Sequence, residues 1–280
     1  MQSPVAPLDV RFRRMSFAFE GQPLPKHWYA DSPSLTHFFN ALSAVFPDGE
    51  LYFIESVRAF EHAVEHPRLQ QQVREFTRQE GHHTHHHRHF NRLVAARGVS
   101  MERCAGIAKT ILSRSQTHDS PLMQLAMTAA FEHFTALMGD WLLRQSNPGS
   151  DIKHCGAASL WSWHAVEETE HKAVAFDVYT AAGGDYWTRI RAMVRVAGIF
   201  IPRIHQMQLI LLSEDESPLR LRDLLFCARY LYGRGGFIRS MIPGFFRYFR
   251  RDFHPWQDDN SQLISAWQIS HMAQSLPPAA

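Results

Sequence analysis

Between residues 36 and 182, apolar residues recur along the chain at alternating spacings of three and four. This alternation places the apolar side chains in one stripe along an α-helix, as in a helical bundle. Breaks at 66–67, 98–118 and 147–149 divide the stretch, and Gly183 and Gly184 end it. The pattern predicts four helices, over about 36–65, 68–97, 120–145 and 152–182. Pro47 falls inside the first of these and is expected to kink or restart it.

Polar residues interrupt each predicted stripe. In the first and third helices the interruption is a lone glutamate, Glu50 and Glu132 respectively. In the second and fourth helices it is a group of acids and histidines within an otherwise apolar series. The second stripe consists of Leu69, Val73, Phe76, Glu80, His83, His87, Phe90 and Val94, and the fourth of Ala157, Trp161, His164, Glu168, His171, Ala175, Val178 and Ala182.

The second and fourth stripes each contain a Glu-x-x-His step, Glu80 to His83 and Glu168 to His171. Residues i and i+3 share a helix face, so each step aims a carboxylate and an imidazole at one point. Two such steps, each preceded by a helix with a lone glutamate, form the ligand set of a two-metal site in a four-helix bundle. The predicted ligands of one metal are Glu50, Glu80 and His83, and those of the other are Glu132, Glu168 and His171, with one or two glutamates bridging.

The depth of the residues within the first hairpin supports the choice of Glu50. Glu50 and Glu80 each lie about fifteen residues from the turn near 65–66, roughly 22 Å along the axis. Glu55 lies two residues from Phe53 and is expected on the opposite face. Glu61 is too close to the turn to reach the same level. We therefore exclude both as ligands.

Histidine is the compositional outlier, with 18 residues in the chain and six of them between 82 and 89. His87 and His164 each lie one turn beyond a predicted ligand on the same stripe. They are candidates either for further ligands or for side chains that support the ligands from behind. The remaining histidines of the cluster lie mostly off the stripe, and we expect them in surface or outer positions: His82, His85, His86 and His89.

The composition of the predicted site indicates which metals it would hold. Carboxylates in an apolar stripe are costly unless paired, and four glutamates balance two divalent cations. A carboxylate and imidazole set without thiolate suits iron, with manganese or zinc as alternatives. The three cysteines are scattered without C-x-x-C spacing, which indicates no disulfide framework and fits a reducing cytosol.

Two further regions flank the predicted bundle at 33–184. Residues 1–32 are predicted to form an irregular extension, and 185–280 a helical cover packed on the bundle. The apolar segment 192–212 contains Arg195, Pro202, Arg203 and His205, so we do not predict a membrane span. No secretory signal is apparent, and we expect a cytoplasmic protein that is able to form a homo-oligomer.

Residues 217–251 alternate arginines with aromatic side chains. A helical cover over one side or end of the bundle is the favoured prediction for this segment. Peripheral contact with a membrane or a lipid-like substrate is the alternative. The net charge of +2 does not indicate binding to nucleic acid.

Several motifs resemble those of the bacterial family described as predicted metal-dependent hydrolases. They are FPDGE at 46–50, QEGHH at 79–83 with His87, FEHF at 131–134, WHAVEETEHKAVAFD at 163–177 and FHPW at 253–256. The resemblance covers about 35–257 and implies a ferritin-like helical enzyme with a metal centre.

The sequence therefore predicts an all-α protein, a ferritin-like four-helix bundle with additional C-terminal helices. The first expectation for its function is a non-haem di-iron oxidoreductase that activates O₂ and oxidises a small organic or lipid-like substrate. One alternative is a dimetal hydrolase that uses a metal-activated water. Another is a ferritin-like iron-binding protein without turnover.

Overall fold

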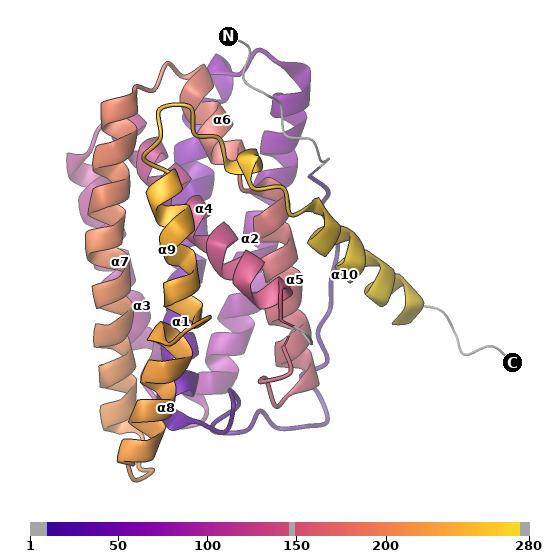
Figure 1. The fold of residues 1–280 in the computed structure, drawn as a ribbon, viewed down its shortest axis with the longest axis vertical. Helices are drawn as coiled ribbons and strands as arrows, with labels where there is room; N and C mark the ends of the chain where they lie inside the picture. Colours follow the sequence, from indigo (N-terminus) through magenta and orange to yellow (C-terminus); the bar gives the residue numbers. More distant parts are fainter. Residues whose placement is uncertain (1–9, 146–148, 275–280) are drawn as a thin grey trace, which may run out of the picture.

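The computed structural model describes residues 10–145 and 149–274, and every regular element in these ranges is a helix (Figure 1). The predicted all-α class is therefore confirmed. The helices are α1 (Pro33–Arg58), η1 (Glu61–Ala63), α2 (Pro67–Ala95), α3 (Met101–His118), α4 (Pro121–Leu143), α5 (Cys155–His171), α6 (Val174–Ala181), α7 (Tyr186–Glu214), α8 (Leu221–Tyr232), α9 (Phe237–Arg247), η2 (Pro255–Gln257) and α10 (Ser261–Gln274).

Four of these helices carry the predicted stripes and pack on one another. α1 packs on α2 and α4, and α5 packs on α4 and α2. α1 and α4 begin in the same way, with a serine whose hydroxyl accepts a hydrogen bond from the helix and a proline directly after it, Ser32–Pro33 and Ser120–Pro121. At Gly139 an added Cβ would lie 2.7 Å from the carbonyl oxygen of Ala165, so only glycine allows this approach of α4 to α5.

α1 continues through Pro47, so the expected restart is wrong. Proline lacks an N–H and leaves the carbonyl four residues earlier without its helical donor. That carbonyl belongs to Ser43, and the side chain of Asn91 on α2 donates to it at 2.9 Å. A hydrogen bond from the neighbouring helix thus replaces the one that the proline removes.

Three predicted boundaries also need correction. α1 ends at Arg58 rather than near residue 65, and η1 follows it. The predicted helix over 152–182 is two helices, α5 and α6, separated by Lys172 and Ala173. The predicted break at 98–118 contains α3, which buries only a sparse face against α1. That face consists of Met101, Cys104, Ala108 and Ser115.

Three of the C-terminal helices, α7, α8 and α9, cover the bundle on one side, whereas α10 packs on α5 (Figure 1). α7 packs on α1 and α4, α8 packs on α1, and α9 packs on α4 (Figure 1). By length and composition α7 could cross a membrane, with 28% of its apolar window buried. Its buried residues, among them Ala192, Met193 and Val196, form one face. Together with its contacts to α1 and α4, this face agrees with a helix packed on a protein core.

Residues 10–32 are irregular, as predicted, and lie against α2 and α5. Their only regular pairing is an isolated bridge between Tyr29 and Ile152. Three phenylalanines in this segment contact the off-stripe histidines of α2 through their rings. The pairs are Phe12 with His82, Phe17 with His86, and Phe19 with His89.

Candidate metal centre

The six predicted ligands come together inside the bundle, and His164 joins them. Their ligand atoms form three buried groups, each lying within 4.8 Å. The groups are Glu50, His83 and His164; Glu80, His83 and Glu168; and Glu80, Glu132 and His171. The side chains come from α1, α2, α4 and α5, so each of the four helices contributes at least one.

The groups share members, as expected if one or two glutamates bridge the two metals. Glu80 belongs both to the group with His83 and to the group with His171. Glu168 lies with Glu80 and His83, and its Oε1 is also 3.5 Å from Nε2 of His171. Glu80 and Glu168 therefore occupy the middle of the cluster, while Glu50 and Glu132 lie at opposite ends.

A metal pair would satisfy polar atoms that the protein leaves unpartnered. Buried carboxylate and imidazole atoms normally have hydrogen-bond partners. Here each predicted ligand has at least one buried side-chain atom without one. The atoms are Glu50 Oε1, both oxygens of Glu80 and of Glu132, His83 Nδ1, Glu168 Oε2 and His171 Nε2. This donor set of oxygen and nitrogen atoms suits divalent cations.

His171 is oriented from behind by a residue that the sequence analysis missed. Its Nδ1 lies 3.0 Å from Oε1 of Gln79, which can only accept, so Nδ1 carries the proton. The other nitrogen, Nε2, is then free to accept a metal. Nε2 lies 3.1 Å from Glu80 Oε1 and 3.3 Å from Glu132 Oε2.

His83 is held in the same way by a buried carboxylate. Its Nε2 donates to Glu167 Oε2 at 3.1 Å, and its Nδ1 faces Glu168 Oε1 at 3.5 Å. Glu167 lies 3.6 Å from Arg13, which also forms two hydrogen bonds with Glu170. The irregular N-terminal segment thus places one cation beside two acids directly behind the centre. A carboxylate behind a ligating histidine is the usual support for a metal site.

His87 and His164, which the sequence analysis left as either ligands or supporting residues, lie in different positions. His164 directs Nε2 at Glu168 Oε1, 2.9 Å away, and belongs to one of the ligand groups. Its Nδ1 lies 2.7 Å from Nε2 of His87, and Nδ1 of His87 lies 2.8 Å from the hydroxyl of Ser43. Ser43 donates to Asn91 Oδ1, so its oxygen accepts from His87. His87 therefore supports His164 and faces away from the ligand groups.

Burial sets the charge states of these groups. It raises the pKa of Glu50, Glu80 and Glu132, and the neighbouring carboxylates add to the effect. Burial also lowers the pKa of His164 to about 4, assisted by the charge of His83, and lowers that of His87 well below its usual range. Without cations Glu50, Glu80 and Glu132 would resist ionisation, whereas His164 stays neutral, as a metal ligand requires.

The excluded acids lie away from the centre. Glu55 and Glu61 are exposed, and the carboxylate of Glu55 accepts a hydrogen bond from Gln116. His85 is exposed as well, while the other off-stripe histidines are half-buried under the N-terminal segment: His82, His86 and His89.

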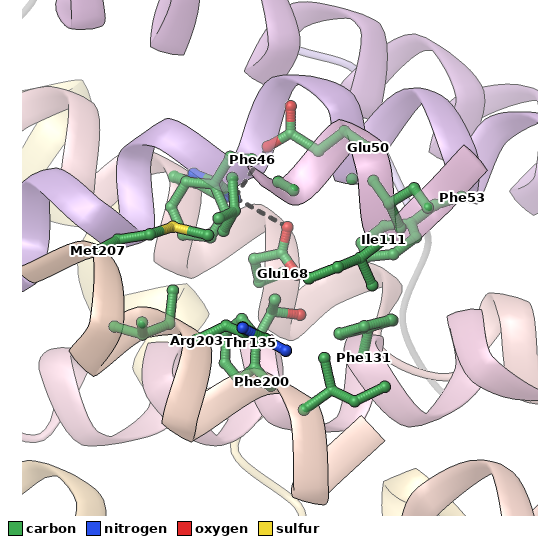
Figure 2. Close-up of a pocket in the computed structure, with 17 residues that line it drawn as sticks. Phe46, Glu50, Phe53, Ile111, Phe131, Thr135, Glu168, Phe200, Arg203 and Met207 are labelled. Atoms are coloured by element: carbon green, nitrogen blue, oxygen red, sulfur yellow. Dashed lines mark hydrogen bonds and ion pairs between the residues drawn. The ribbon is translucent and has the colours of Figure 1, made fainter. Parts of the chain in front are cut away.

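An apolar hollow leads from α7 to the centre (Figure 2). Glu50, Glu168 and His164 form its polar end, and Thr135 and Arg203 are the other polar residues in its lining. The remaining walls are largely apolar and come from α1, α3, α4 and α7. They include Phe46, Phe53, Ile111, Phe131, Phe200 and Met207, which Figure 2 shows around the two carboxylates.

A bundle with buried glutamate and histidine groups beside an apolar hollow defines a class of helical metal-binding proteins. The family described as predicted metal-dependent hydrolase matches residues 11–259, so the chain belongs to this family. No curated protein matches the chain, and no solved structure does. Family membership and the buried clusters together support metal dependence.

Proposed function

We propose that α1, α2, α4 and α5–α6 form a ferritin-like bundle around two metal ions, and that the protein is an enzyme acting there on an apolar substrate. The observation that carries this proposal is the set of unpartnered carboxylate and imidazole atoms from four helices. His83, His171 and His164 each point one nitrogen into the cluster and bind a supporting residue through the other. Such an arrangement holds ligand directions before the metals bind.

Hydrolysis is the reaction that the family description favours. Bound divalent ions would supply Lewis-acid activation of water for hydrolysis or, as ferrous iron, electrons for a reaction with O₂. The protein's own contribution is an apolar wall beside the cluster, formed by Phe46, Phe53 and Phe131. Thr135 donates its hydroxyl proton to the carbonyl of Glu132, so it offers a substrate only an acceptor.

Di-iron oxidation of the substrate is the second candidate, and two observations favour it. The ligand set contains carboxylate and imidazole but no thiolate, which suits iron. The hollow also presents mostly carbon atoms to the cluster, as the oxidation of an apolar substrate requires. Iron storage without turnover has less support, because an apolar hollow that reaches the cluster is suited to binding an organic molecule, which storage of iron does not require.

One experiment separates the two reactions. The protein is loaded anaerobically with Fe²⁺ and mixed with O₂, and a parallel sample is loaded with Zn²⁺ or Mn²⁺ and given aliphatic esters and amides. Turnover of an ester or amide without an O₂-dependent spectral change supports hydrolysis. A new near-ultraviolet or visible absorption after O₂, with no ester or amide turnover, supports oxidation. If neither Fe²⁺ nor the metal of the parallel sample binds, the proposal as a whole is contradicted.

A further inference from the structure

A second apolar hollow lies beside the first and reaches the cluster at two of the same residues, His164 and Glu168. Its lining includes Leu42, Met138, Leu142 and Phe237, from α1, α4 and α9. Of the residues that the structure describes, Glu168 is the only charged one in this lining. This hollow is separate from the one that opens beside α7, since most of the lining residues differ.

Four residues line both hollows, and they mark where the two meet. They are Phe46, Thr135, His164 and Glu168. Two of them belong to the candidate metal centre, so a molecule occupying both hollows would pass the centre with an apolar part on each side. A compact substrate would fill one hollow and leave the other unoccupied.

Among the described residues that line either hollow, Arg203 on α7 is the only cation. It is exposed and donates to the neutral side chain of Gln206 at 2.6 Å. No acidic partner of Arg203 is found in the described part of the chain. A guanidinium at the rim of an apolar hollow pairs with a carboxylate or phosphate while the attached chain remains in the hollow.

We infer that the substrate is a linear, acyl-like chain with one anionic end. The end pairs with Arg203, the chain runs through the first hollow past Glu168, and its far part occupies the second hollow. The group that reacts is then internal to the chain and lies near Thr135 and His164. This inference rests on the proposed function, because it identifies the substrate class of the same centre.

The arrangement is tested by comparing how tightly the metal-loaded protein binds aliphatic ligands of different chain length and head group. Displacement of a fluorescent fatty acid is measured with palmitate, octanoate, hexadecyl phosphate and 1-hexadecanol. Palmitate should bind at least about tenfold more tightly than octanoate, because only the longer chain reaches the second hollow. Either hexadecyl anion should bind more tightly than hexadecanol, and the tighter one identifies the head group as carboxylate or phosphate. Equal binding of palmitate and octanoate would overturn the inference.

Three variants and one control variant assign the binding to the two hollows. Leu142→Trp fills the second hollow and should weaken palmitate binding about tenfold while leaving octanoate within about threefold. Ile111→Trp narrows the first hollow and should weaken the binding of both palmitate and octanoate. Arg203→Gln should weaken the binding of the anions about tenfold and leave the binding of hexadecanol unchanged. Arg191→Gln is the control, on the same helix but outside both hollows, and should change the binding of neither.

Metal content is measured on the same samples. Normal metal content with no chain-length dependence contradicts the inference and leaves the proposed function standing. Chain binding by a protein that takes up no metal contradicts the proposed function instead. If Leu142→Trp does not fold, Ile111→Trp and the two anions still decide the outcome.

Discussion

Nδ1 of His164 lies 2.7 Å from Nε2 of His87, and this hydrogen bond turns the other nitrogen of His164 toward Glu168. Nδ1 of His164 carries a proton and donates it in a hydrogen bond to Nε2 of His87. Nε2 of His87 can accept because Nδ1 of the same ring carries the His87 proton and donates to Ser43. Two neutral imidazoles, one behind the other, thus connect the buried Ser43 of α1 to the candidate metal centre.

Replacing His87 should weaken metal binding without removing a ligand. Loss of a supporting residue typically lowers metal affinity about 10- to 100-fold. We expect His87→Ala to lower the metal affinity by a factor in this range, as measured by titration with Fe²⁺ or Zn²⁺. His85→Ala, an exposed position on the same helix, is the matched control and should bind metal as the wild type does. Unchanged affinity in His87→Ala would refute the supporting role.

Glu50 and Glu55 provide a comparison within one helix. Glu50 is buried beside His83 and His164, whereas Glu55 is exposed and bonds Gln116. We expect Glu50→Gln to lose or weaken metal binding and Glu55→Gln to retain it, as measured by elemental analysis. Metal loss in the Glu55 variant alone would show that the assignment of the α1 face is wrong.

Arg13 should contribute to stability from outside the bundle. It pairs with Glu170 and Glu167, which are both buried, so Arg13→Gln leaves carboxylates without a cation. We expect a loss of about 2 kcal/mol in the free energy of unfolding, below the value for a fully buried pair. This discount reflects the 21% exposure of the Arg13 side chain. Arg14→Gln, at an exposed neighbouring position, is the control and should change stability by less than about 0.5 kcal/mol.

Asp215 should make stability depend on pH in the acid range. Its carboxylate accepts from Lys26, His27 and His37 at 2.8 Å each, and these contacts outweigh burial and lower its pKa. Because the folded pKa lies below the unfolded value of about 3.9, the stabilisation is complete above that pH and is lost as the pH falls below it.

Chemical unfolding of Asp215→Asn tests this dependence. At pH 7 the variant should be less stable than the wild type by about 2 kcal/mol, the value of hydrogen bonds to a charged group. The difference should shrink steadily as the pH is lowered from 4 toward 2. A difference that stayed constant over this range would show that the Asp215 charge is not the cause.

The sequence predicts the inward-facing groups better than the groups behind them. Glu50, Glu80, Glu132 and Glu168 interrupt apolar stripes, and a residue on such a stripe must face the interior. Glu167 lies off the stripe, yet it is buried because the N-terminal segment covers that face of α5. Its partner Arg13 is distant in sequence and lies in an irregular segment, so no local periodicity connects the two.

Helix boundaries were predictable only where proline or a capping serine marks them. Pro67 and Pro121 begin helices within one residue of the predicted starts, whereas α1 begins at Pro33, about three residues before the predicted start. The interruption between α5 and α6 contains neither proline nor glycine. Lys172 lies there with its ammonium 4.0 Å from the Trp256 ring and bonded to Asn260, contacts with the C-terminal segment that no local pattern reveals.

Elemental analysis tests the account most directly. Protein purified without added metal and then equilibrated with Fe²⁺ should contain about two ions per chain, as the ligand set of a two-metal bundle requires. Glu80→Ala and Glu168→Ala, which remove the two central carboxylates, should both lose metal while remaining folded by circular dichroism. Full occupancy by two ions in both variants would contradict the assignment of these glutamates to the metal centre.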